Sequence, residues 1–85
     1  MAKYKIDIKK SAVKEISKLP TKELKRILKA LELLADNPKP NGVIKLSGDE
    51  KFRLRIGNYR ILYQIFDKKL TVIVVKVGRR KDIYK

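Results

Sequence analysis

Apolar and polar residues alternate at the start of the chain and then change to a helical spacing. Tyr4, Ile6 and Ile8 are separated by charged residues, which predicts a half-buried β-strand. Apolar residues then recur every third or fourth position, and this spacing predicts a helix that Ser11 caps and Pro20 ends. The apolar stripe of this helix would consist of Ala12, Val13, Ile16 and Leu19.

A second and longer helix is expected from Thr21, which can cap it, to the Asn37-Pro38 stop. Proline cannot continue a helix, and the residues from Pro38 to Gly42 are typical of a loop. The first half of the chain is therefore predicted to be a strand followed by a two-helix hairpin. The apolar stripe of the second helix would consist of Leu24, Ile27, Leu28, Leu31 and Leu34.

The second half is organised around residues 52–66, with the sequence FRLRIGNYRILYQIF. Apolar residues alternate with arginines up to Gly57-Asn58, and aromatic and β-branched residues resume at Tyr59. Because glycine can take the positive φ of a type II′ turn, this two-residue connection predicts a β-hairpin. Residues 43–47 and a turn at 48–50 precede the hairpin, and a turn at Asp67-Lys68 follows it. The apolar segment 70–77 would then form a strand in the sheet interior.

The two-residue turn also predicts the register of the hairpin. Ile56 would lie opposite Tyr59, and Arg55 opposite Arg60, so that Arg53, Arg55 and Arg60 share one face of the sheet. Like charges directly opposite each other destabilise a sheet. The arrangement therefore needs a reason beyond folding, and an anion bound over this face would supply one.

Together these elements predict one α+β domain over residues 1–85. Its order would be β-α-α-β-β-β, with an antiparallel sheet and a two-helix hairpin packed on one face. The arginines would then lie on the opposite, exposed face. Antiparallel pairing would return Arg79, Arg80 and Tyr84 of the C-terminal segment toward Arg60. Guanidinium groups remain charged and suit bidentate phosphate contact, so their convergence indicates a phosphate site.

Charge and composition narrow the chemistry. The chain has 23 Lys and Arg residues against 9 Asp and Glu, a formal net charge of +14. This charge favours anionic partners, and nucleic acid is favoured over an acidic protein because arginines gather on a sheet face. With no cysteine and no histidine, the chain cannot use disulfides, thiol chemistry or imidazole catalysis. No apolar run approaches the roughly 20 residues that span a bilayer, and no signal peptide is recognisable, so a cytoplasmic location is expected.

The chain resembles the RelE/ParE superfamily of toxins from type II toxin-antitoxin systems, and within it the RelE type. The resemblance covers nearly the whole chain, and two blocks in this order and at this spacing are its most specific part: residues 52–65 and VGRRKDIY at 77–84. Further matching features are Tyr4-Lys5-Ile6, the break at Lys18-Leu19-Pro20, the Asn37-Pro38 stop and Lys45-Leu46-Ser47-Gly48.

This resemblance implies an endoribonuclease that cleaves mRNA in the ribosomal A site, uses no metal or cofactor, and is neutralised by a cognate antitoxin in a hetero-oligomer. The ribose 2′-hydroxyl would attack the adjacent phosphate, while basic groups offset the growing charge. The family's site residues fall on Arg53, Arg55, Arg60, Arg80 and Tyr84, with Lys51, Arg79 and Lys81 as further RNA contacts. The resemblance implies that Arg60 and Arg80 stabilise the phosphorane, that Arg80 protonates the leaving oxygen, and that Tyr84 orients the substrate.

The general base and two alternative functions remain open. Well-known RelE toxins carry lysines where this chain has Arg53 and Arg55, and an arginine is a poor base. Lys51, Lys81, solvent or ribosomal RNA could accept the proton instead. A ParE-type toxin would keep the fold but poison DNA gyrase, whereas a plain binding module would hold RNA or an antitoxin without chemistry. The joint presence of Arg60, Arg80 and Tyr84 favours the nuclease.

Overall fold

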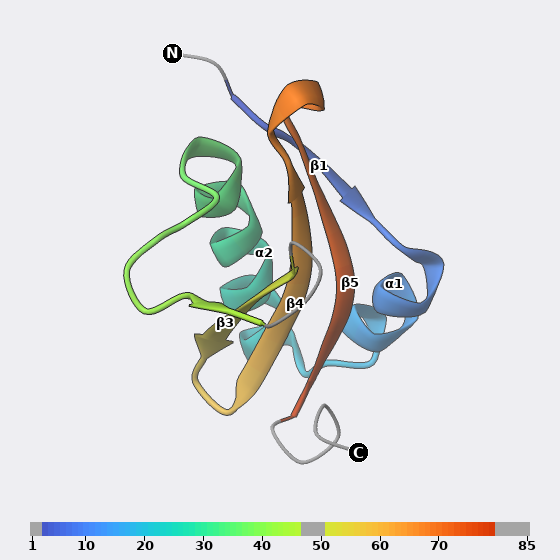
Figure 1. The fold of residues 1–85 in the computed structure, drawn as a ribbon. Coiled ribbons are helices and arrows are strands. Elements are labelled where there is room, and N and C mark those ends of the chain that lie inside the picture. The colour runs from blue at the N-terminus through green and yellow to red at the C-terminus, as the bar shows by residue number, and fades with distance from the viewer. Residues whose placement is uncertain (1–2, 47–50, 80–85) are drawn as a thin grey trace.

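The computed structural model describes residues 3–46 and 51–79, which form a mixed β-sheet with two helices on one side (Figure 1). Neither helix in these two ranges is long and apolar enough to cross a membrane. The elements are β1 (Lys5–Ile8), α1 (Lys10–Ser17), α2 (Thr21–Asp36), β2 (Ile44–Lys45), β3 (Lys51–Ile56), β4 (Tyr59–Phe66), the 3-10 turn η1 (Asp67–Lys69) and β5 (Thr71–Arg79).

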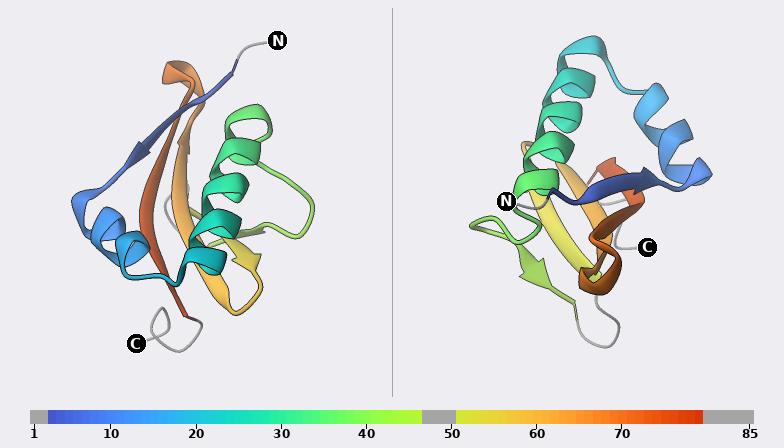
Figure 2. Two further views of the ribbon diagram at one scale, coloured as in Figure 1. Left: turned by 180° about the vertical axis from the view of Figure 1, so that it is seen from behind. Right: turned by 90° about the horizontal axis from the view of Figure 1, so that it is seen from above.

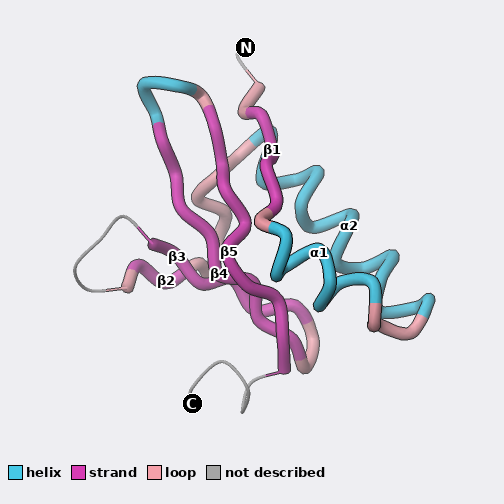
Figure 3. The backbone as a smooth tube through the Cα atoms, turned by 90° about the vertical axis from the view of Figure 1, so that its right-hand side faces the viewer, coloured by secondary structure: helices cyan, strands magenta, loops and turns pink. Residues whose placement is uncertain are grey.

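The sheet has the strand order β1-β5-β4-β3-β2. Strands β3, β4 and β5 form the predicted antiparallel meander, and both helices cover the same face, as the views in Figures 2 and 3 show. The predicted α+β class with a helix hairpin on one face is therefore confirmed. Two features were not in the prediction: β1 runs parallel to β5, which makes the sheet mixed, and the two-residue strand β2 extends it beyond β3.

The hairpin has the predicted register. Ile56 lies opposite Tyr59, and Arg55 lies opposite Arg60. Gly57 has a φ of +59°, whereas Asn58 does not have a positive φ, and this combination matches a type II′ turn. A Cβ at Gly57 would lie 3.2 Å from Nη1 of Arg26, the flexible end of a side chain, so backbone conformation is the main reason for a glycine here.

The helix boundaries differ from the predicted ones. Lys9 is the N-cap of α1 and Pro20 is the N-cap of α2, so the predicted caps Ser11 and Thr21 are wrong. Neither N-cap residue makes a side-chain capping hydrogen bond. The backbone N–H of Lys9 donates to the carbonyl of Val74 at 3.0 Å, which ties this residue to the sheet and makes the helix begin directly after it. Helix α1 ends at Ser17, before the residue preceding Pro20.

The core lies between the helices and the sheet. On α2, Ile27, Leu31 and Leu34 are buried as predicted, and they pack in one cluster with side chains from β3, β4 and β5. Two residues of the predicted stripes are not core residues, because Val13 is 49% exposed and Leu28 is 44% exposed. Leu28 instead lines an open groove together with Ile6 and Ile8 of β1.

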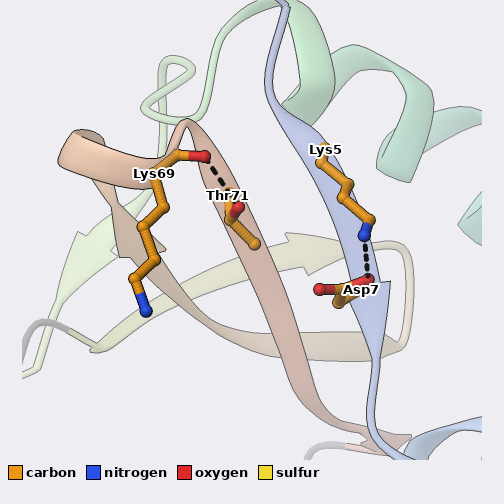
Figure 4. Close-up of polar contacts among 4 residues, drawn as sticks. All are labelled: Lys5, Asp7, Lys69 and Thr71. Carbon is orange, nitrogen blue, oxygen red and sulfur yellow. Dashed lines mark hydrogen bonds and ion pairs between the residues drawn. The ribbon is translucent and has the colours of Figure 1, made fainter.

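Local polar contacts lie at the start of β5 and along the neighbouring strand β1 (Figure 4). The hydroxyl of Thr71 donates to the carbonyl of Lys69 at 2.9 Å, and Leu70 between them has a positive φ of 46°. On the neighbouring strand the ammonium of Lys5 lies 3.8 Å from the carboxylate of Asp7. The Thr71 contact belongs to the turn that returns the chain from β4 into β5, whereas the Lys5–Asp7 ion pair lies within β1.

Candidate functional site

Three arginines line one pocket on the face of the sheet away from the helices. Phe52, Leu54, Tyr59 and Ile61 are buried on the helix side, so period-2 alternation turns the arginines between them to the other side. The pocket has a volume of about 290 Å³. It is lined by Gly42, Ile44, Arg53, Arg55 and Arg60, and is called the arginine pocket below. The structure thus brings together three of the predicted site residues.

The three guanidinium groups differ in exposure. Arg55 is exposed and Arg53 is half-buried, whereas Arg60 is only 7% exposed. The expectation that the whole face is exposed is therefore wrong for Arg60. This residue lies on the central strand β4, between Arg55 of β3 and Gly78 of β5. A charge held away from bulk water acts more strongly on a nearby anion, because the surrounding dielectric is lower.

Arg55 is also held by its own turn. Its Nε lies 3.5 Å from the carbonyl oxygen of Gly57, at the long limit for a hydrogen bond. Its direct neighbour across the hairpin is Arg60, so two positive charges face each other in adjacent strands. This pairing opposes folding by some fraction of about 1 kcal/mol. The site therefore concentrates positive charge at a position where folding alone would disfavour it.

The remaining predicted residues do not all join this pocket. Lys51 begins β3 two residues before Arg53 and so shares its face, but it does not line the pocket. Arg79 lies directly opposite Tyr59, so it shares the face of that buried tyrosine, and Gly78 is the residue opposite Arg60. The predicted return of Arg79 to the Tyr59 and Arg60 end of β4 is therefore confirmed, but this pairing sets Arg79 on the face opposite to that of Arg60. Arg80, Lys81 and Tyr84 lie outside the described residues.

One wall of the pocket is formed by Gly42 and Ile44, and the sequence pattern did not point to either residue. Gly42 has a φ of +88°, in the region that favours glycine, and no atom lies within 4 Å of the position of a Cβ there. Ile44 pairs with Arg53 through the short strand β2. The only available signal was the Asn41-Gly42 pair, which indicates a turn but does not show that the turn lies beside the arginines.

Aromatic residues of the core fix the loop that carries this wall. The Tyr63 hydroxyl donates to the carbonyl oxygen of Pro38 at 2.7 Å, and its ring stacks on Phe52 with a centroid distance of 5.9 Å. Burial raises the pKa of Tyr63 above its ordinary value, so its phenol stays protonated and keeps donating this hydrogen bond at alkaline as well as neutral pH. The ammonium of Lys39 lies 5.5 Å from the Phe52 ring centroid. The loop is thus fixed to β3 and β4, the strands that carry the arginines.

Glu15 of α1 supports the end of β5 that borders Arg60. Strand β1 pairs with β5 only as far as Val74, and none of the strands in residues 3–46 and 51–79 pairs with the next residues on that side. There the carboxylate of Glu15 accepts a hydrogen bond from the backbone N–H of Val77 at 3.1 Å and lies 3.7 Å from Nζ of Lys76. Helix α1 therefore replaces β1 as the lateral support of β5 beside Gly78, the residue opposite Arg60.

Comparison with known proteins identifies the family. A family model described as ParE toxin of type II toxin-antitoxin system, parDE, matches residues 6–84. The mRNA interferase toxin RelE of Escherichia coli strain K12 is 31% identical over 80 residues, which cover 92% of this chain and 84% of that toxin.

Solved structures agree with this family in fold. The archaeal RelE-RelB complex from Pyrococcus horikoshii OT3 matches with a TM-score of 0.84 and 31% identity, covering 92% of this chain and 96% of that one. The intact Escherichia coli RelBE toxin-antitoxin complex matches with a TM-score of 0.80 and 26% identity, covering 89% and 95%. With its helix hairpin, its mixed sheet and a match over residues 6–84, this chain belongs to the ParE toxin family of type II toxin-antitoxin systems.

Proposed function

We propose that this protein is a RelE-type toxin that cleaves mRNA, and that the arginine pocket binds the phosphodiester at which the chain is cut. The observation that carries the proposal is the convergence of Arg53, Arg55 and Arg60 on one pocket. The similarity to a protein named mRNA interferase toxin RelE supports the same activity. Guanidinium groups bind phosphate through parallel N–H donors, so three of them around one pocket suit a phosphodiester.

The proposed reaction is an in-line attack of the ribose 2′-hydroxyl on the adjacent phosphate. The 2′-oxygen forms a bond to phosphorus and loses its proton, while the bond to the 5′-oxygen breaks and that oxygen gains a proton. The products carry a 2′,3′-cyclic phosphate and a 5′-hydroxyl. Extra negative charge builds on the phosphate oxygens during this step, and fixed guanidinium groups stabilise it more than they stabilise the ground state.

The three arginines would divide this work by their exposure. Arg55 is exposed and can meet the RNA first, whereas Arg60 is nearly buried on the central strand and is positioned before the substrate arrives. Preorganised charge needs no rearrangement during the reaction, which is why such groups contribute strongly to catalysis. The family resemblance assigns the protonation of the leaving oxygen to Arg80 and substrate orientation to Tyr84. It also assigns RNA contacts to Lys51, Arg79 and Lys81.

The proposal extends to the place of action and the partners. The substrate would be mRNA in the A site of a translating ribosome, so the toxin would act in the cytoplasm. A cognate antitoxin would neutralise it in a hetero-oligomer, as the RelE-RelB and RelBE complexes suggest by similarity. A groove of about 630 Å³ between β1 and α2 supports such a partner, because exposed Leu28 and Leu33 line it together with Ile6 and Ile8.

A gyrase poison is the second candidate, because the matching family model is that of ParE toxins. Two assays separate the candidates. In a translating extract the protein is expected to produce mRNA cuts in phase with the codons, and these cuts should require ribosomes. In a gyrase supercoiling assay it is expected to leave the reaction unchanged. Loss of supercoiling without codon-phased cuts would reject the nuclease in favour of the gyrase poison. If neither effect is seen, a binding module without chemistry is the remaining function.

Glu15 provides a further test of how the fold supports the site. Glu15→Ala removes the acceptor for the Val77 N–H and is expected to lower the free energy of unfolding by about 1–2 kcal/mol. It should also lower the cleavage rate several-fold, because β5 loses its support beside Arg60. Glu15→Gln keeps an acceptor oxygen and should retain most of the stability and most of the cleavage rate. Urea unfolding and cleavage in the extract measure the two effects, and equal losses in both variants would contradict this role.

A further inference from the structure

Ile44 is an apolar side chain among charged ones. It is 48% exposed, it lies directly across from Arg53, and it lines the arginine pocket together with Arg55 and Arg60. Other exposed aliphatic residues, such as Leu33 at 59% and Leu70 at 40%, do not line this pocket. Scattered exposed apolar residues are normal on protein surfaces, so it is the location of Ile44 that requires an explanation.

We propose that Ile44 contacts the face of the nucleobase of the nucleotide whose phosphate the three arginines bind. This inference rests on the proposed function. A nucleotide combines an anionic phosphate with a flat base whose faces are apolar, and the arginine pocket presents both kinds of surface side by side. Its volume of about 290 Å³ suits one nucleotide rather than a longer stretch of RNA. Contact with a base face tolerates any sequence, because every base has such a face.

The backbone holds Ile44 in place before any ligand binds. The preceding loop is fixed by the hydrogen bond from Tyr63 to Pro38, and the N–H of Val43 donates to the carbonyl of Pro40 at 3.2 Å. After Ile44, the N–H of Leu46 donates to the carbonyl of Lys51 at 2.9 Å, which continues the pairing with β3. Ile44 therefore keeps a fixed position relative to Arg53, as a substrate-contacting residue requires.

The test combines a change in the protein with a change in the RNA. Cleavage is measured on ribosome complexes with an intact codon and with a codon that lacks the base next to the scissile phosphate. For the intact codon, Ile44→Ala is expected to raise KM about 5- to 10-fold and to change kcat less than twofold. For the abasic codon, wild type and Ile44→Ala should have the same KM. Ile44→Leu should restore the wild-type KM. The matched control is Val13→Ala on α1, an exposed aliphatic residue outside the pocket, and it should change neither constant.

If Ile44→Ala raises KM equally for the intact and the abasic codon, the proposed contact between Ile44 and the base is wrong, even when the protein cleaves mRNA. A binding experiment keeps the inference testable if no cleavage is found. In an NMR titration with a 2′-O-methyl RNA trinucleotide, the Ile44 methyl signals of the wild-type protein should shift with the intact RNA and shift much less with the abasic one. Identical shifts with both would reject the base contact, whereas failure of cleavage alone would reject only the proposed function.

Discussion

Arg60→Met is expected to lower the rate of mRNA cleavage about 10²- to 10³-fold. Arg60 is only 7% exposed and lies on the central strand, where its charge is fixed beside Arg55. Methionine fills much of the same volume but removes the positive charge and the N–H donors, so the transition state loses its preorganised partner. The single-turnover rate on ribosome complexes measures this loss, because that rate reports the chemical step.

Arg60→Lys is the matched variant, and it keeps the charge while it removes the planar fork. Its rate should lie between those of the wild type and Arg60→Met, since a lysine is a point charge without bidentate geometry. Thermal unfolding of both variants shows whether the fold is retained. A folded Arg60→Met that cleaves within a few-fold of the wild-type rate would contradict a catalytic role for this residue.

Arg55→Thr is expected to stabilise the protein while it weakens the enzyme. Arg55 and Arg60 lie directly opposite each other. Removal of one of these like charges should raise the free energy of unfolding by a fraction of about 1 kcal/mol. Threonine is also favourable in a strand. Cleavage should fall about 10²-fold, because one of three guanidinium groups around the phosphate is lost. Urea unfolding and single-turnover cleavage of the same preparation measure the two effects.

Arg53→Thr is the control for this change. Arg53 lines the same pocket, but its cross-strand neighbours are Ile44 and Leu62 rather than another arginine. Its replacement should therefore weaken cleavage without the gain in stability. If Arg55→Thr is less stable than the wild type, the like-charge interpretation of the hairpin fails, and the argument that an anion explains the arrangement fails with it.

The hairpin was the part of the fold that the sequence determined best. A two-residue turn leaves one register for the flanking strands, and alternation then assigns each side chain to a face. The shared face of Arg53, Arg55 and Arg60 followed from these two rules, and the structure has that register. Local pattern and tertiary structure agree here because the contacts that matter are between residues close in the chain.

The parts that the sequence did not predict depend on contacts between distant segments. The parallel pairing of β1 with β5 joins the start of the chain to its last strand, and alternation within β1 does not encode its direction. Strand β2 has only two residues, too few to show a period, so the position of Ile44 beside Arg53 was not visible. The burial of Arg60 depends on both neighbouring strands, and the face of Arg79 depends on its exact partner in β4.

The central proposal is that the arginine pocket binds the phosphate at which mRNA is cut. A crystal structure of the protein with an RNA that carries a 2′-deoxyribose at the cleavage position tests it most directly, because the attacking hydroxyl is absent and the RNA stays intact. The scissile phosphate should lie in the arginine pocket, within hydrogen-bond distance of the guanidinium groups of Arg55 and Arg60. An RNA bound with that phosphate on another surface of the protein, and with the pocket unused, would contradict the claim.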